Sequence, residues 1–336
     1  MSSDVFWQRW WKILRHQPAV WFFILLAQVP GLLMIWLSAP IFLALPPLDA
    51  PPAVWEAWLQ RQRDVLLGAG LALTCVMVLL GLAIWVLSVW AQAGIITTVR
   101  RVWGREDEPL PWDEARRGLG GPTLRLLLLQ LVLILVGALV AVLLFGALVG
   151  ILAFGSSDDP GPFIAVLLLG GLCLLLPLVF LVAPWIWGLM VAVVAEYPAS
   201  WRETWDAFWR VARRAWLAFY AMFVIYLTLN FVLSLVKQIL LMPLTWLAFF
   251  LAGEPSNWLQ ALSAVISGTV QVVLQAVTQV IGVTGWTVLY LHYREQEIPS
   301  PGARPAGSWA AEAVWPSDPA SPEAFPAEPD AAPDEP

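Results

Sequence analysis

Six long apolar runs dominate this 336-residue sequence, and they constrain the fold more than any other feature. A helix needs about 20 apolar residues to cross the hydrocarbon core of a bilayer, because each residue advances it by about 1.5 Å. Every run meets that length, so the sequence predicts an all-α integral membrane protein with six transmembrane helices. The predicted spans lie near residues 19–42, 66–99, 124–154, 163–195, 215–250 and 259–293.

The composition agrees with a polytopic membrane protein, because 60% of the residues are hydrophobic, 12% are charged and the mean hydropathy is +0.75. Soluble domains carry about 25% charged residues, and an outer-membrane barrel would show short alternating strands instead of long apolar runs. Nothing in the charge pattern indicates nucleic-acid binding. Cys75 and Cys173 lie inside apolar runs without ligand spacing, so we expect no disulfide, metal site or cofactor.

The basic residues alternate between the loops that would connect these spans. They gather before span one, between spans two and three, between spans four and five, and after span six. The intervening loops hold only Arg61 and Arg63. Because basic loops stay on the cytoplasmic side, this alternation predicts that both termini are cytoplasmic. The apolar run from Ala19 is then a retained anchor instead of a cleaved signal peptide.

Residues 200–216 predict an amphipathic helix that lies on the membrane surface and leads into span five. Ser200 and Glu203 have the S-x-x-E spacing of a capping box, so the helix should begin at Trp201. Aromatic residues on one face and arginines on the other suit the boundary between acyl chains and headgroups. The alternative, a helix packed on a soluble core, is disfavoured by the apolar runs on both sides. The residues expected at the boundary with anionic headgroups are Trp201, Trp205, Phe208, Arg210, Arg213 and Arg214.

A weak internal repeat is also present, because each cytoplasmic stretch combines aromatic and basic residues and precedes two spans. The three units open with FWQRWWKILRH, PWDEARRGLGG and residues 200–216. Gly94, Gly188 and Gly285 occupy similar places near the ends of spans two, four and six. The repeat predicts three helical hairpins, each preceded by a cytoplasmic interfacial helix. The alternative is that any cytoplasmic loop of a membrane protein collects Trp and Arg.

Polar residues recur at four-residue steps on spans five and six, where they would be costly if they faced lipid. We call them the polar seam. Two interpretations stay open: hydrogen bonds between helices, each worth less than about 2 kcal/mol, or a surface that lines a solute pathway. The residues of the polar seam are Asn230, Ser234, Gln238, Ser267, Gln271, Gln275 and Gln279.

The sequence divides into a membrane domain, residues 1–294, and a tail, residues 295–336. The tail is acidic and rich in proline, and it cannot bury enough apolar surface to fold, so we expect it to be disordered. The membrane domain shows no nucleophile motif or phosphate-binding loop, and His16 and His292 have no metal-ligand partners at suitable spacing. We therefore expect a protein that is not an enzyme.

Four segments carry a resemblance to a known family: FWQRWWKILRHQPAVWFF, AGIITTVRRVWGRED followed by WDEA, VAEYPASWRETWDAFWRVARRAW, and TVLYLHYRE. Together they resemble a group of bacterial polytopic proteins related to the membrane domain of glycerophosphodiester phosphodiesterases. The resemblance implies a membrane module of the bacterial cytoplasmic (inner) membrane. Some members of that family carry a separate hydrolase domain; we expect none here, so the resemblance transfers no catalytic residue.

Two functional hypotheses follow from these observations. The first is a non-enzymatic membrane module that organises anionic lipids, or a protein partner in the membrane or cytoplasm, through its aromatic and basic helices. The alternative is a small-solute transporter or exporter that uses the polar seam between spans five and six.

Overall fold

The structure is a computed structural model, and it describes residues 3–44, 46, 51–154, 177, 180–251 and 257–296. Within these residues every regular element is a helix, which confirms the predicted all-α class. The helices are α1 (Ser3–His16), α2 (Pro18–Ala44), α3 (Pro52–Arg101), α4 (Trp112–Arg116), α5 (Gly120–Phe154), α7 (Trp201–Leu251), α8 (Asn257–Glu295) and a shorter apolar helix at Phe180–Ala195.

Five of these helices, α2, α3, α5, α7 and α8, are long and apolar enough to cross a membrane, so the chain is a multi-pass membrane protein. They coincide with five of the six predicted spans. About half of the fourth predicted span, 163–195, lies outside the described residues, which include its residue 177 and residues 180–195. The predicted tail likewise lies outside them after Gln296.

α3 differs most from its predicted span, because it begins at Pro52 and not near residue 66. Proline is favoured at the first turn of a helix. Residues 53–66, which follow it, are mostly good helix formers and include no glycine or proline. The hydropathy pattern finds the apolar part of this helix, Thr74–Arg101, but not its more polar beginning.

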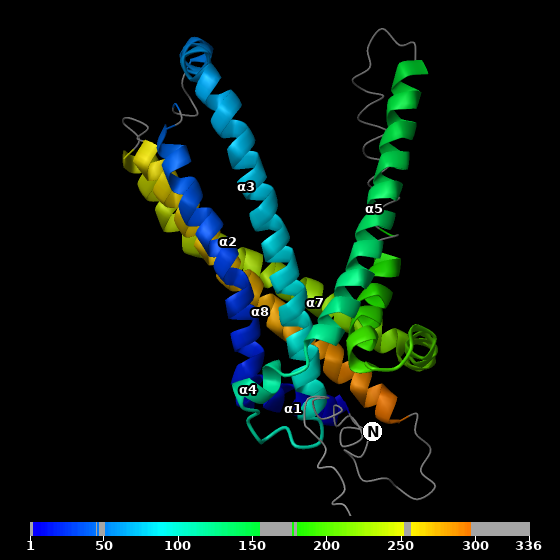
Figure 1. The fold of residues 1–336 in the computed structure, drawn as a ribbon. Coiled ribbons are helices and arrows are strands. Elements are labelled where there is room, and N and C mark those ends of the chain that lie inside the picture. Colours follow the sequence, from blue (N-terminus) through cyan, green and yellow to red (C-terminus); the bar gives the residue numbers. More distant parts are fainter. Residues whose placement is uncertain are drawn as a thin grey trace, which may run out of the picture. The chain divides into compact units, whose positions relative to one another are not determined.

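α8 contacts four other helices, α1, α2, α3 and α7, while α4 and α5 contact α3. Figure 1 shows α2 running beside α8. A Cβ atom at Gly268 would lie 3.0 Å from Ile35 of α2, and one at Gly282 would lie 2.8 Å from the ring of Tyr226 on α7. Glycine on α8 therefore lets both neighbouring helices approach closely, as is common in membrane bundles.

The buried core lies toward the ends of three helices, where residues 93–99, 190–195 and 282–292 are buried. Each of these runs lies at or near one of the glycines of the predicted repeat. A Cβ atom at Gly94 would lie 2.6 Å from the Phe23 ring, and one at Gly188 would lie 2.6 Å from the Phe219 ring. A Cβ atom at Gly285 would meet the side chain of Met222. These three helix ends are thus packed more tightly than the rest of the bundle.

The three expected surface helices differ in the structure. α1 has 14 residues and is separate from α2, whereas α4 has only five and starts after Pro111 without a side-chain cap. The indole of Trp112 on α4 packs on the rings of Phe22 and Phe23, with centroids 4.5 and 4.7 Å away. α4 therefore contributes a packing contact to α2 instead of an extended interfacial surface.

The start of α7 is as predicted. The backbone N–H of Ser200 donates to Glu203 Oε2 at 2.7 Å, and the Glu203 N–H donates to Ser200 Oγ at 3.2 Å, which is the capping box. α7 then continues without interruption for 51 residues, about 77 Å at 1.5 Å per residue. The hydrocarbon core is only about 30 Å thick. The amphipathic beginning of α7 and its apolar remainder cannot both lie within that core along the bilayer normal.

Candidate functional site

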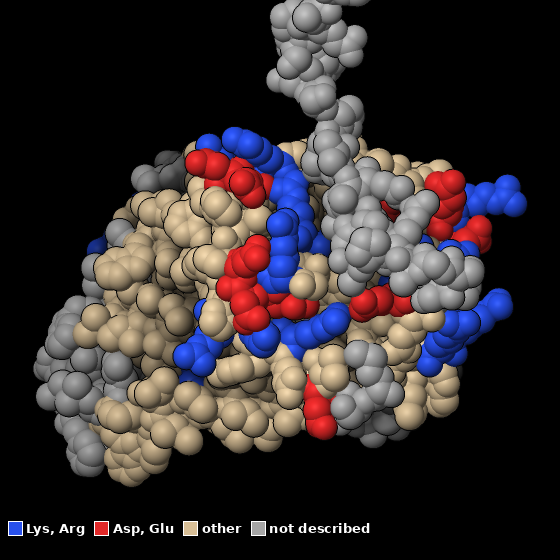
Figure 2. Space-filling view, turned by 90° about the horizontal axis from the view of Figure 1, so that it is seen from below, with Lys and Arg blue, Asp and Glu red and all other residues tan. Residues whose placement is uncertain are grey.

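Charged residues gather in one region, which we call the charged end. It consists of α1, residues 102–119, residues 196–200, the start of α7 and the last turn of α8. Figure 2 shows Lys and Arg side chains interleaved with Asp and Glu side chains on this face. Many basic groups at the charged end therefore have acidic neighbours. Some of these basic side chains make contacts within the protein, and others are exposed.

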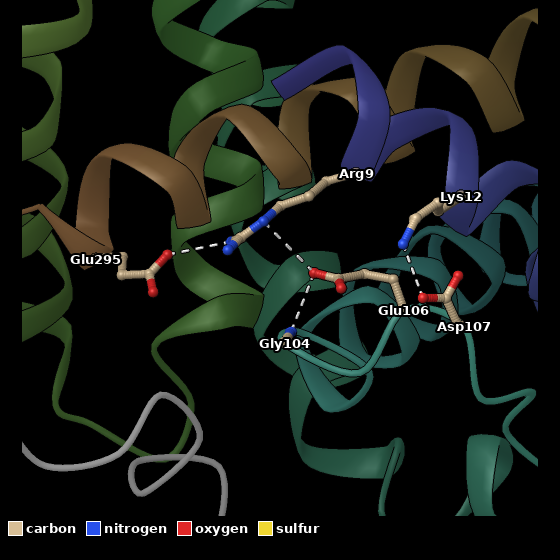
Figure 3. Close-up of polar contacts among 6 residues, drawn as sticks. All are labelled: Arg9, Lys12, Gly104, Glu106, Asp107 and Glu295. Atoms are coloured by element: carbon tan, nitrogen blue, oxygen red, sulfur yellow. Dashed lines mark hydrogen bonds and ion pairs between the residues drawn. The ribbon is translucent and has the colours of Figure 1, made fainter. Parts of the chain in front are cut away.

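Arg9 on α1 joins three segments of the charged end. Its Nη1 atom lies 3.2 Å from Glu295 Oε2 of α8, and its Nε atom lies 3.7 Å from Glu106 Oε1. The same Glu106 oxygen accepts a hydrogen bond from the Gly104 N–H at 3.0 Å, as Figure 3 shows. The guanidinium also lies over the Trp103 ring, 4.7 Å from its centroid. Arg9 is thus committed to contacts within the protein.

Lys12 makes a second ion pair from α1 to the same loop, with Nζ 2.7 Å from Asp107 Oδ2 (Figure 3). The hydrogen bond and the charge of Asp107 raise the pKa of Lys12 above its ordinary value. The hydrogen bond from Lys12 in turn lowers the pKa of Asp107. Both groups therefore stay charged across the neutral range, and α1 stays paired with the loop.

Gln17, between α1 and α2, fixes the course of the loop from the inside. Its side chain is fully buried, and Nε2 donates to the carbonyl oxygens of Glu106 at 3.2 Å and Glu108 at 2.7 Å. Its Oε1 atom accepts the N–H of Leu110 at 3.0 Å. These bonds satisfy backbone groups that would otherwise be buried without partners. The sequence does not predict this role for Gln17, because one glutamine between two helices carries no periodic signal.

Glu196 connects the ends of the tightly packed helices. It accepts hydrogen bonds from the Tyr290 hydroxyl and from Arg294 Nε, both at 2.9 Å. Beside it, Arg100 Nη1 donates to the Tyr197 carbonyl at 2.7 Å. Side chains from α3 and α8 therefore meet at the turn that follows the Phe180–Ala195 helix. The Glu196 carboxylate thus holds these helix ends together through hydrogen bonds from Tyr290 and Arg294.

The predicted apolar face at the start of α7 separates into two parts, which corrects the grouping made from the sequence. Phe208 is only 2% exposed and packs within the protein, whereas Trp201 and Trp205 are 47% and 48% exposed. Hydropathy cannot distinguish an apolar side chain that faces protein from one that faces lipid. Two further indoles, at spacings of four and eleven residues from Trp205, share this exposure. We call the exposed set the tryptophan strip: Trp201, Trp205, Trp209 and Trp216.

The arginines of α7 are exposed, as predicted, but they do not all lie beside the tryptophan strip. At about 100° per residue, Arg202 and Arg213 follow directly on its edge, whereas Arg210 and Arg214 lie farther around the helix. Arg202 and Arg213 make no ion pair with any described residue. They were not distinguished from the other arginines in the sequence, because that distinction depends on which side of the helix is buried.

The polar seam is divided between two neighbours of α8. Gln271 Oε1 accepts a hydrogen bond from Lys237 Nζ of α7 at 2.7 Å, so the two helices meet at this level as expected. Gln279 Oε1 instead accepts from Gln28 Nε2 of α2 at 3.3 Å. The two glutamines that bond to a neighbouring helix thus link α8 to two different helices.

The α7 half of the polar seam does not face the α8 half along its whole length. Asn230 donates from Nδ2 to the Tyr226 carbonyl of its own helix at 2.8 Å, and it is exposed. A four-residue step drifts by about 40° on an α-helix, so rows on two helices wind away from each other. The remaining members are exposed or half-buried: Ser234, Gln238, Gln275 and Ser267.

The described part of the chain holds no group of three or more His, Cys, Asp or Glu side chains placed to hold a metal ion. His292 is buried near the charged end, with Nε2 3.1 Å from Gln296 Nε2. Among the exposed side chains, guanidinium groups can bind anions, and indoles suit a lipid interface.

No family model, no curated protein and no solved structure matches this chain. The resemblance to the phosphodiesterase membrane domains therefore depends on the four sequence segments alone.

Proposed function

We propose that this chain is a non-enzymatic membrane module of the bacterial inner membrane that organises anionic lipids at its charged end. In this proposal six spans form three hairpins, both termini are cytoplasmic, and the charged end lies at the cytoplasmic leaflet. The alternation of basic loops supports this orientation, because the exposed arginines of α7 belong to one of the basic stretches. The family resemblance supports the class of module and nothing more specific.

The observation that carries the proposal is the tryptophan strip with Arg202 and Arg213 at its edge. Its indoles are between 37% and 53% exposed, which suits the headgroup region of a bilayer. Arginine can keep its stem along this apolar surface while the guanidinium reaches a phosphate. Each such arginine contributes roughly 1 kcal/mol to binding an anionic surface. Membrane lipids with anionic headgroups are therefore the partner that this surface fits best.

α1 offers a contrast within the same molecule. Trp7 and Trp11 are 42% and 65% exposed, so α1 also presents indoles. Its Arg9 and Lys12, however, are paired with Glu106, Glu295 and Asp107. Arg15, in the last turn of α1, is exposed and makes no ion pair with a described residue. α1 thus keeps one such arginine, whereas α7 offers two at the edge of its exposed indoles.

The experiment compares Arg202→Gln/Arg213→Gln with the matched double variant Arg61→Gln/Arg63→Gln at the beginning of α3. Each full-length protein is purified from the same membranes in mild detergent, and the retained lipids are quantified by mass spectrometry. We expect the ratio of anionic to zwitterionic lipid to fall at least about fivefold in the α7 variant, from about 1 kcal/mol per arginine. The control should resemble the wild type; equal ratios in all three proteins would remove the proposal.

The alternative of a solute pathway along the polar seam has less support. Gln271 and Gln279 are bonded to side chains of different helices, as residues that hold helices together would be. A pathway requires cysteines at Gln271, Gln275 and Gln279 all to react with a polar thiol reagent. Under the packing proposal, the Gln279→Cys variant is protected.

A further inference from the structure

Arg125, near the start of α5, has an environment that differs from those of Arg9 and Arg294. Its Nη2 donates to the Ala199 carbonyl, and the guanidinium lies over the rings of Trp201 and Tyr197, 4.9 and 5.5 Å from their centroids. Arg9 and Arg294 each contact a carboxylate, but Arg125 forms no ion pair with any described residue. Its positive charge therefore lacks a negative partner within the described chain.

Two polar atoms beside Trp201 are buried without a hydrogen-bond partner. One is Nη1 of Arg125, and the other is Oγ1 of Thr204, a residue that is only 1% exposed. Thr204 follows Trp201 by three positions, so the two side chains lie on neighbouring parts of the same α7 face. A buried polar group without a partner lowers stability, and the cost is greater for a charged group. Two such groups near the start of α7 indicate a missing acceptor.

The place of these residues indicates what kind of acceptor fits. Trp201 is 47% exposed and belongs to the tryptophan strip, which we place at headgroup level, so Arg125 lies at the same level. The first turn of α5 contains no acidic residue, so the positive end of its helix dipole is uncompensated there. An anion with several oxygen acceptors, as in a phosphate group, complements this combination.

We propose that Arg125 and Thr204 form a site for a phosphate group between the starts of α5 and α7, occupied by the headgroup of an anionic phospholipid. Nη1 of Arg125 and the Thr204 hydroxyl donate to phosphate oxygens, while Trp201 and Tyr197 hold the guanidinium plane. This site depends on the proposed function for its source of phosphate. It is distinct from the exposed strip, because its donors are buried and should retain one lipid through purification.

The test measures bound phospholipid per protein by native mass spectrometry on the full-length chain in mild detergent. We expect the retained anionic lipid to fall roughly tenfold in Arg125→Gln, because this variant loses a charge-assisted hydrogen bond to the phosphate. Thr204→Val should lose a few-fold. Arg116→Gln, which breaks an exposed pair with Asp113, is the matched control and should retain lipid as the wild type does.

Further measurements keep the outcomes distinct. Arg125→Lys preserves the charge and should fold while retaining less lipid than the wild type, which separates lost binding from lost folding. Inorganic phosphate at matched ionic strength should not stabilise the delipidated wild type more than chloride does; phosphate stabilisation that Arg125→Gln abolishes would overturn the headgroup as source. Equal lipid retention in Arg125→Gln and wild type would overturn the site. If Arg125→Gln retains less anionic lipid and Arg202→Gln/Arg213→Gln retains as much as the wild type, only the lipid-binding role of the tryptophan strip would be refuted.

Discussion

At the scale of single residues, the tightly packed helix ends depend on positions where one added methyl group would overlap a neighbouring side chain. Gly94 faces the ring of Phe23, and Gly188 faces that of Phe219, so neither position has room for a methyl group. Gly81, on the same helix as Gly94, has no neighbour within 4 Å of a Cβ atom. The two glycines of α3 therefore have opposite roles.

This difference predicts the result of a matched pair of substitutions. Gly94→Ala should lower the free energy of unfolding by about 1–3 kcal/mol, because the new methyl group overlaps the Phe23 ring. Gly81→Ala should leave it unchanged or raise it by up to about 1 kcal/mol, since alanine favours the helix. Thermal unfolding of both variants in the same detergent checks this; an equal change in both would show that Gly94 is not a contact point.

A second residue-scale prediction concerns Glu196, whose side chain is only 17% exposed and receives bonds from Tyr290 and Arg294. Glu196→Gln removes the negative charge while keeping the shape, so the ion pair between Glu196 and Arg294 is lost in a largely buried place. We expect a loss of about 1–3 kcal/mol in unfolding free energy. Asp113→Asn, in an exposed pair with Arg116, should have no measurable effect.

At the scale of elements, α1 and the loop after α3 behave as one unit held by Arg9, Lys12 and Gln17. The Lys12–Asp107 pair has a definite pH dependence. The lowered pKa of Asp107 means that its contribution is present above the ordinary aspartate pKa, about 3.9, and is lost as pH falls through the lower folded value. The raised pKa of Lys12 means that its contribution is present below about 10.4 and is lost only as pH rises through the higher folded value.

We therefore expect the difference in unfolding midpoint between wild type and Asp107→Asn to be constant from about pH 5 to pH 9. The difference should shrink toward about pH 3, where Asp107 becomes protonated in the wild type, and again above about pH 10, where Lys12 loses its proton. Glu108→Gln is the neighbouring control and should show no such pattern. A difference that changed steadily between pH 6 and pH 8 would exclude this pair as its cause.

The two faces of α7 give the next prediction, because adjacent aromatic residues have opposite environments. Phe208 is 2% exposed and Trp209 is 37% exposed. Phe208→Ala should lower the unfolding free energy in detergent by about 3–5 kcal/mol through the cavity that it leaves. Trp209→Ala should cost much less stability but weaken retention of anionic lipid. The reverse order of stability losses would mean that the tryptophan strip faces the protein.

The sequence predicted where α7 begins, but not which of its apolar side chains are buried. Hydropathy and the capping box located the helix and its first residue, because both signals are local. The division between Phe208 and the exposed indoles depends on which neighbours cover the helix, and all of these residues are apolar. The same limit applies to Gln28 and Gln279, which are far apart in the sequence and meet only because α2 packs on α8.

At the scale of the whole molecule, apolar length and charge alternation predicted the helical class and the positions of five long apolar helices. They did not predict the ion pairs of Arg9 or the bonds of Gln17, since long-range contacts depend on how the helices pack. The orientation of the charged end is a proposal that follows from the basic loops. It also determines whether the tryptophan strip and the Arg125 site meet the anionic inner leaflet.

Labelling of single cysteines in intact cells tests this orientation most directly. In a protein with Cys75 and Cys173 replaced, cysteines are placed at Arg105 and Arg202 of the charged end, and at Arg61 and Asn257 near the starts of α3 and α8. A membrane-impermeant thiol reagent should label the latter two from outside, and the former two only after the cells are opened. Labelling of Arg202→Cys in intact cells, with Arg61→Cys protected, would contradict the account.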